Sequence, residues 1–362
     1  MLLAFGEIMM RVAPSGRLRL RQVMPGAVDV TFAGAEANVC ASLAMFGIPA
    51  RFVTALPKHT IADAAVGVLR GLGVDTGHIL RRDAGRLGVY YVEAGANQRG
   101  TTVIYDRDHS AISQASPEEY DFAAALQGVK AVHVTGITPS LGEPAFRSTL
   151  ALVKLAKERG LPVSCDLNFR KKLWRWRKGT EPKALAGECM SELLPHVDLA
   201  IANEEDCADV LDIHAAGTNI EHGQINAAAY EQVARAVVAR FPNLRRVAIT
   251  LRESISADHN NWGGMLFDTA SDRAVFAPLD EGGQYRPYEI RDIVDRVGGG
   301  DAFGAGLLFA LNTPELADPQ RALHFAVASS CLKHSILGDF NYVSRDEVEA
   351  LVGGAASGRV RR

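Results

Sequence analysis

Short apolar runs alternate with longer stretches of helical periodicity along most of this 362-residue chain. The runs are rich in β-branched residues and predict buried strands, while apolar positions at helical spacing predict amphipathic helices between them. This alternation is typical of an α/β fold, in which helices flank a mainly parallel sheet and ligands bind at the carboxyl ends of the strands. The expected strands are 129–134, 162–167, 199–202 and 246–251, and the expected helices are 143–159, 183–194 and 227–240.

Two regions break the alternation. Residues of about 8–32 and about 86–108 have strand patterns without intervening helices, and β-forming tyrosines enrich the second region. They predict a small β-sheet that projects from the main body as a lid. After the strand at 246–251, the Asn-Asn-Trp-Gly-Gly stretch at 260–264 is expected to form the turn of a hairpin. We therefore expect one catalytic domain over residues 1–362, with the lid inserted in it.

Composition and charge narrow the class of protein. Apolar residues make up 48% of the chain, enough for a sizeable core, and a formal net charge of -3 gives no general attraction to nucleic acid or anionic membrane. Five scattered cysteines without a CxxC pair predict neither a disulfide framework nor a zinc site. No apolar run is long enough for a signal peptide or a membrane span. We expect a cytoplasmic protein with no nucleic-acid and no membrane partner.

Three glycines precede an acid near the C-terminus, at the expected start of a helix. Gly298, Gly299 and Gly300 allow close approach to the main chain, and first-turn amides without internal partners favour a phosphate. Asp301 would repel that phosphate if its only task were binding, so a general base for an attacking hydroxyl explains it better. The alternative is that Asp301 only caps the helix. Since no Lys follows Gly300, the segment is not a Walker loop.

A second segment of small residues leads into an apolar helix near the N-terminus. Gly34 and Ala35 leave room for a ligand against the main chain, and Asn38 offers both donors and acceptors one turn later. A tight strand-to-helix turn with a buried polar residue is the alternative.

The segments Gly34–Asn38 and Asp295–Leu307 resemble the two signatures of the PfkB (ribokinase-like) carbohydrate kinase family, in the same order. Within that family the chain looks most similar to the 2-keto-3-deoxygluconate (2-dehydro-3-deoxygluconate) kinases. Segments similar to those enzymes are 88–90, 105–107, 166–170, 250–254 and 333–341. The resemblance implies a ribokinase-like fold, ATP and Mg²⁺ as cofactors, and transfer to the 6-hydroxyl of 2-keto-3-deoxygluconate. It leaves open whether a monovalent cation is needed.

The period of two in a strand places Tyr105 and Arg107 on one face, with Tyr90 on a strand expected to neighbour it. An arginine flanked by phenols suits a planar carboxylate, which neutral sugars lack. The alternative is that Arg107 is a solvated charge on an edge strand and that Tyr105 only packs. Exposed edges of the lid sheet also favour pairing between subunits, so we expect a homo-oligomer.

The resemblance implies a role for each residue of the expected site. Catalysis is expected from Asp301, Arg170, Gly298, Gly299 and Gly300. The sugar acid is expected at Gly34, Ala35, Asn38, Tyr90, Tyr105, Arg107, Arg170, Asp301 and Asp339, and the nucleotide at Asn168, Asn203, Thr250, Arg252, Ser254, Gly298, Gly300 and Asn341. Asn203 and Asp206 resemble the family's Asn-x-x-Glu motif, with Asp in the last position, and are expected in the outer shell of magnesium.

Two other functions stay open at this point. One is a fructokinase or ribokinase acting on a neutral sugar, and the other is a sensor that keeps the fold without turnover. A basic and aromatic run at 170–178 suggests nucleic-acid binding, but such a run on an acidic protein is more typical of a solvated face.

Overall fold

A nine-stranded sheet forms the centre of the computed structural model, which describes residues 1–203, 205–214 and 227–354. Its strands are β1 (Leu2–Phe5), β4 (Ala50–Val53), β9 (Ala131–Thr135), β10 (Val163–Asp166), β11 (Leu199–Ala202), β12 (Arg246–Ser256), β13 (His259–Asp268), β14 (Arg273–Ala277) and β15 (Tyr288–Ile290). The run β12-β11-β10-β9-β1-β4 is parallel. β13 pairs antiparallel with β12, β14 and β15. The parallel part places the carboxyl ends of its strands at one edge of the sheet, as the alternating pattern predicts.

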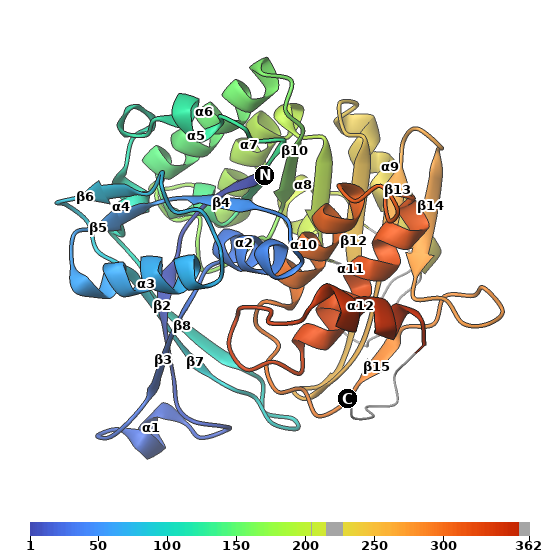
Figure 1. The fold of residues 1–362 in the computed structure, drawn as a ribbon, viewed down its shortest axis with the longest axis horizontal. Helices are drawn as coiled ribbons and strands as arrows, with labels where there is room; N and C mark the ends of the chain where they lie inside the picture. Colours follow the sequence, from blue (N-terminus) through green and yellow to red (C-terminus); the bar gives the residue numbers. More distant parts are fainter. Residues whose placement is uncertain (204, 215–226, 355–362) are drawn as a thin grey trace.

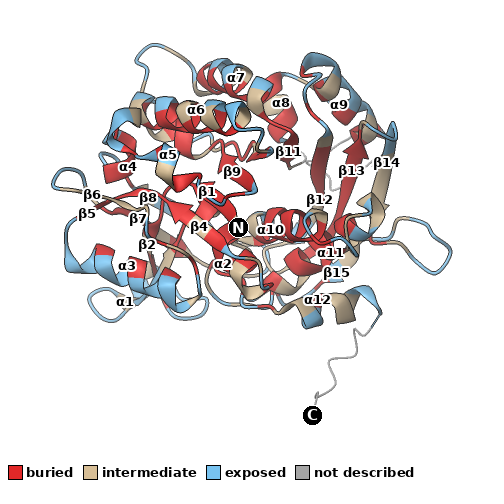
Figure 2. Cartoon of the chain, turned by 45° about the horizontal axis from the view of Figure 1, so that its top comes forward, coloured by how far each residue is buried: buried red, intermediate tan, exposed pale blue. Residues whose placement is uncertain are grey.

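Helices cover both faces of this sheet (Figure 1). One layer holds α2 (Ala35–Met45), α3 (Thr60–Gly71), α10 (Gly299–Leu311), α11 (Pro319–Lys333) and α12 (Arg345–Val352), and the other holds α4 (Ala111–Gln114), α5 (Phe122–Ala125), α6 (Glu143–Glu158), α7 (Pro182–Leu193), α8 (Asp206–Leu211) and α9 (Ala227–Arg240). Successive residues of a strand point to opposite faces of the sheet and so pack into different hydrophobic cores. In β1, Leu3 and Phe5 belong to one core, and Leu2 and Ala4 belong to the other. Figure 2 shows the buried strands between helices whose outer faces are exposed.

A separate small sheet projects from the main body at the lower left of Figure 1. Its strands are β2 (Met9–Ala13), β3 (Asp29–Ala33), β7 (Gly88–Glu93) and β8 (Thr102–Asp106), in the order β3-β2-β7-β8. A one-turn helix, α1 (Leu20–Val23), lies between β2 and β3, although the sequence pattern predicted none there. The short strands β5 (Ala55–Pro57) and β6 (Leu80–Arg82) form a third, two-stranded sheet.

The register of the small sheet decides which side chains face the main body. Arg11, Tyr90 and Tyr105 lie directly opposite one another on neighbouring strands and share one face. The next row, on the opposite face, is apolar and ends in exposed residues on both edge strands. That row is Val30, Val12, Tyr91 and Ile104, of which Val30 and Ile104 are each 53% exposed. The face with Arg11 and the two tyrosines is turned toward the site described below, whereas the row on the other face ends at the sheet edges in the two exposed apolar side chains.

The turn predicted at 260–264 is wrong. β12 continues to Ser256, the chain turns at 257–258, and 260–264 lie inside β13. Trp262 is buried there, and the glycines serve close packing: a Cβ on Gly263 would lie 2.3 Å from the Tyr285 hydroxyl oxygen. The Gly-Gly pair resembles a turn signal but marks a strand whose neighbours leave no room for side chains.

The other predicted strands and helices of the main body are confirmed, with ends that differ by a few residues, except that β12 extends to Ser256. In the part of the chain that the structure describes, no helix is long and apolar enough to cross a membrane. All five cysteines are free thiols.

Candidate active site

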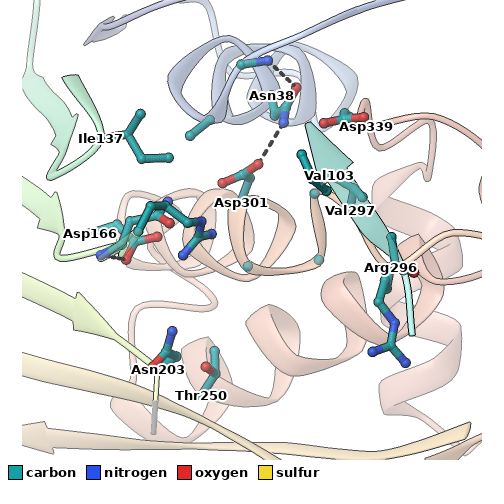
Figure 3. A pocket seen from close by; sticks show the side chains of 18 of the residues that line it. Asn38, Val103, Ile137, Asp166, Asn203, Thr250, Arg296, Val297, Asp301 and Asp339 are labelled. Carbon is teal, nitrogen blue, oxygen red and sulfur yellow. Dashed lines mark hydrogen bonds between the residues drawn. The ribbon is translucent and has the colours of Figure 1, made fainter. Parts of the chain in front are cut away.

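A cavity of about 520 Å³ opens where the small sheet meets the carboxyl ends of the parallel strands. The N-terminal turns of α2 and α10 complete its wall, so segments from both ends of the chain meet there (Figure 3). Of the residues expected from the sequence, the following line this cavity: Gly34, Ala35, Asn38, Tyr90, Tyr105, Arg107, Asn168, Arg170, Asn203, Asp206, Thr250, Arg252, Gly298, Gly299, Gly300, Asp301 and Asp339.

Asp301 lies in the first turn of α10 with its carboxylate held by Asn38. The Asn38 side-chain amide donates to Asp301 Oδ2 over 2.7 Å, and its carbonyl oxygen accepts from the Gly34 amide at 3.3 Å (Figure 3). The helix begins at Gly299 with Gly298 as its N-cap, so Asp301 does not cap it. Burial raises the pKa of Asp301 to about 6, while the Asn38 hydrogen bond acts to lower it and Asp339 to raise it. At neutral pH this carboxylate is therefore ionised and able to accept a proton.

Of the three glycines before Asp301, the first two leave little room for a side chain. Gly298 has a φ of +84°, and a Cβ there would lie 2.3 Å from the Asp339 carbonyl oxygen. A Cβ on Gly299 would lie 3.1 Å from the His334 ring, whereas one on Gly300 would meet open space. The amides of Gly300 and Asp301 donate to no acceptor among the described residues. They are the orphan donors of a helix start on the cavity wall, an arrangement that suits an anion.

Arg107 is buried and already carries a carboxylate partner from the chain. Its Nε donates to Glu7 Oε2 at 2.8 Å, its Nη2 contacts the same oxygen, and its guanidinium lies 5.4 Å from the centre of the Tyr105 ring. With Arg107 only 5% exposed, the interpretation as a solvated edge charge is wrong. Nη1 makes no hydrogen bond to the described residues. Half of the guanidinium therefore stays available to a ligand in the cavity.

Arg11, which the sequence analysis did not single out, ties the small sheet to the glycine segment. Its two terminal nitrogens lie 2.5 Å from Asp339 Oδ1 and 2.5 Å from Asp295 Oδ2, and all three side chains are buried. The Tyr90 hydroxyl donates to the same oxygen of Asp339 at 2.6 Å. Asp295 also accepts from the amide of Val297, next to Gly298. The signal that could have found Arg11 is the period of two, which places Met9 and Arg11 on the same face of β2.

Two further acids of the cavity lie in segments that the sequence analysis named, 34–38 and 166–170, but received no role of their own. Glu36 is fully buried and accepts from the hydroxyls of Thr135 at 2.7 Å and Thr138 at 2.8 Å, and burial raises its pKa to about 7. Asp166 ends β10 beside Arg170, and burial, with Asp206 and Asp301 nearby, holds the pKa of Asp166 well above its usual range. An acid directly after a buried strand was the available signal for Asp166.

Asn203 and Asp206 hold each other and the start of α8. Asn203 Oδ1 accepts from the amides of Glu205 and Asp206, while Asp206 accepts from the amides of Asn203 at 2.9 Å and Phe169 at 3.0 Å. Both carboxylate oxygens of Asp206 are thus occupied by backbone amides. No group of three or more His, Cys, Asp or Glu suited to a metal ion occurs among the described residues.

Two residues expected at the nucleotide do not line the cavity. Ser254 is exposed near the tip of β12. Asn341 is buried, where it donates to the Ser329 hydroxyl at 3.3 Å and accepts from the Val343 amide. Its hydrogen bonds hold the chain between α11 and α12, so the structure gives it a supporting position.

Comparisons with known proteins agree with this geometry. The sequence model described as "pfkB family carbohydrate kinase" matches residues 1–240. A 2-dehydro-3-deoxygalactonokinase of Haloferax volcanii is 30% identical over 357 residues, which cover 99% of this chain and 98% of that protein. The crystal structure of a 2-dehydro-3-deoxygluconokinase from Thermotoga maritima is similar with a TM-score of 0.87 at 42% identity, covering 98% of this chain and 99% of that one. A fructokinase from Xylella fastidiosa with bound ATP shares the fold, with a TM-score of 0.74 at 19% identity and coverage of 98% and 99%.

Proposed function

Because this chain belongs to the pfkB family of carbohydrate kinases, we propose that it uses ATP to phosphorylate the 6-hydroxyl of 2-keto-3-deoxygluconate. The observation that carries the proposal is a single cavity with a proton acceptor at one place and a buried arginine at another. Asp301 and the glycine segment suit the hydroxyl and the transferred phosphoryl group, and Arg107 with Tyr105 suits the carboxylate. The names of the two relatives at 30% and 42% identity support an acid sugar over a neutral one.

The proposed reaction is an in-line transfer. Asp301 removes the proton of the 6-hydroxyl as that oxygen bonds to the γ-phosphorus of ATP, and the bond from this phosphorus to the bridging oxygen breaks, releasing ADP. The free amides of Gly300 and Asp301 stabilise the charge that develops on the phosphoryl oxygens. Arg170, on the cavity wall beside Asp166 and within electrostatic reach of Asp301, offsets the rest.

Substrate and nucleotide would occupy opposite ends of the cavity. Gly34, Ala35, Asn38, Tyr90 and Tyr105 surround the proposed sugar site, with Asp339 behind Tyr90. Asn168, Asn203, Thr250 and Arg252 line the end proposed for the nucleotide, away from the small sheet.

The residues present fit a magnesium ion that arrives with ATP. Asp166 lines the cavity and has one carboxylate oxygen, Oδ2, without a hydrogen bond among the described residues, whereas Asp206 is occupied by amides. Asp166 would face the ion through waters, while Asn203 and Asp206, whose oxygens accept from backbone amides, would hold the start of α8. Magnesium supplies charge neutralisation for the phosphate oxygens. We propose no site for a monovalent cation.

The small sheet would act as a lid within a single catalytic domain and exclude water during transfer. Its apolar outer row, exposed at Val30 and Ile104, supports the proposal of a homo-oligomer that pairs through this face. Free thiols throughout fit the proposed cytoplasmic location.

A substrate panel tests the function. Rates with ATP would be measured for 2-keto-3-deoxygluconate, 2-keto-3-deoxygalactonate, fructose and ribose, in the wild type and in Arg107→Ala. We expect the wild type to prefer the keto-deoxy acids, and Arg107→Ala to lose that preference while its rate on fructose changes little. A wild type that prefers fructose or ribose would contradict the acid-sugar proposal. A variant that keeps the preference would remove Arg107 from carboxylate recognition.

A further inference from the structure

We infer that Glu7 is a specificity-determining residue: it moderates Arg107, so that a plain carboxylate binds weakly and a ligand needs the sugar hydroxyls as well. The inference rests on the proposed function in taking Arg107 as the partner of the substrate carboxylate. It goes further in giving a role to an internal acid that occupies half of that arginine.

The geometry of the pair is the first support. Glu7 and Arg107 line the cavity and are 3% and 5% exposed, and one oxygen of Glu7 accepts from two nitrogens of Arg107. That contact uses the Nε and Nη2 edge and leaves Nη1 without a partner among the described residues. A ligand carboxylate can therefore approach from one side only, which fixes its orientation.

The surroundings of Glu7 and Arg107 are the second support. A Cβ on Gly88 would lie 2.9 Å from Glu7 Oε1 and 3.3 Å from Arg107 Cβ, so glycine at this place makes room for both side chains. Oε1 of Glu7 makes no hydrogen bond in the described structure, although it is buried. A buried carboxylate with an unused oxygen is a costly way to fix an arginine, which argues for a purpose other than stability.

Charge explains that purpose. A carboxylate that binds Arg107 shares the guanidinium with Glu7, and the two negative groups repel each other. A bare guanidinium would attract any small anion, including the phosphates of ATP, which enter the same cavity in the proposed reaction. Glu7 weakens the binding of every anion to Arg107 by a similar amount. Ligands are then distinguished by the contacts that only the sugar can make.

Pyruvate is a suitable probe, because it has the carboxylate, the ketone and the third carbon of a 2-keto-3-deoxy acid but none of its hydroxyls. We would measure its competitive inhibition constant, and its direct binding by calorimetry, in the wild type and in Glu7→Gln. Glutamine keeps the shape and one acceptor oxygen but removes the charge. The expected result is that pyruvate binds on the order of tenfold more tightly to Glu7→Gln. A purely structural role for Glu7 predicts the opposite sign, since a disturbed Arg107 would bind pyruvate less well.

Three further variants make the result decisive. Glu93→Gln changes the net charge equally at the far end of β7, outside the cavity, and should leave pyruvate binding within about twofold of the wild type. Glu7→Asp moves the carboxylate away from Arg107 by one carbon, so pyruvate should bind about two- to threefold more tightly than to the wild type. This variant decides the question if Glu7→Gln does not fold. Adding Arg107→Ala to Glu7→Gln should abolish the gain.

Unchanged or weaker pyruvate binding in Glu7→Gln, or a gain that survives Arg107→Ala, would overturn the inference. Failure of the proposed function is a separate outcome: it would appear in the wild type, as a preference for neutral sugars in the substrate panel. If the wild type prefers acid sugars and Glu7→Gln shows no gain, only the inference about Glu7 is lost.

Discussion

The side-chain amide of Asn38 donates a hydrogen bond to the Asp301 carboxylate over 2.7 Å, between residues 263 positions apart in the sequence. Asn38 in turn is fixed through the amide of Gly34. The first helix of the main body thus orients the acid on α10, and the two helices pack against each other. A hydrogen bond to the charged form also favours ionisation, which opposes the effect of burial on the pKa of Asp301.

Asp301→Asn should leave the fold intact and lower kcat by about 10² to 10⁴, because general-base catalysis contributes that much. Asparagine keeps an oxygen that can accept from Asn38 but cannot take the proton of the 6-hydroxyl. A coupled assay measures the rate, and calorimetry with ATP confirms that the nucleotide still binds. If most of the turnover survived, Asp301 would not be the base.

The dependence of kcat/KM on pH should show an acid limb near pH 6. The raised pKa of Asp301, about 6, means that the carboxyl is protonated and inactive below this pH, so activity rises as pH increases through it. In Asn38→Ala the hydrogen bond that lowers the pKa is gone, and the limb should move to higher pH. A limb that stays in place in this variant would show that another group controls it.

Asp206→Ala should reduce the free energy of unfolding by about 2 kcal/mol, because the buried amides of Asn203 and Phe169 lose their acceptor. The control is Asp209→Ala on the same helix, where the ion pair with Lys183 is partly exposed and a loss below about 1 kcal/mol is expected. Urea unfolding measures both. Equal losses in the two variants would mean that Asp206 does not hold these amides.

Arg11→Met should cost about 3 to 5 kcal/mol of unfolding free energy, since it leaves Asp295 and Asp339 buried without their cation. Adding Asp339→Asn removes one of these charges and should recover part of the loss. If the double variant were less stable than Arg11→Met by the full cost of a second independent substitution, the two residues would not be coupled.

Most of the main body could be predicted from the sequence, because apolar positions mark its strands and helices by their spacing. β11, for example, lies at the predicted residues. Asp301 could be found because an acid after three glycines is unusual on physical grounds. Arg11 was harder to find, since a charge on a short strand has the same local pattern whether it is solvated or buried, and Glu7 lies between β1 and β2, where no period applies. Their partners, Arg107, Asp295 and Asp339, lie far away in the sequence.

The wrong prediction of a turn has a similar origin. The glycines of β13 were taken for a turn because the sequence does not show that the Tyr285 side chain packs on one of them. Asn341 was expected at the nucleotide from its segment alone, and that segment does not show its hydrogen bonds with Ser329 and Val343. In both places the missing information was which other residue lies against the one considered.

The alternation within β2 has a consequence for how this enzyme can diverge. Inserting or deleting one residue in that strand would turn Arg11 away from Asp295 and Asp339 and put an apolar neighbour in its place. Natural variation in length should therefore accumulate in the connections around α1 and between β7 and β8, while the strands themselves keep a constant number of residues.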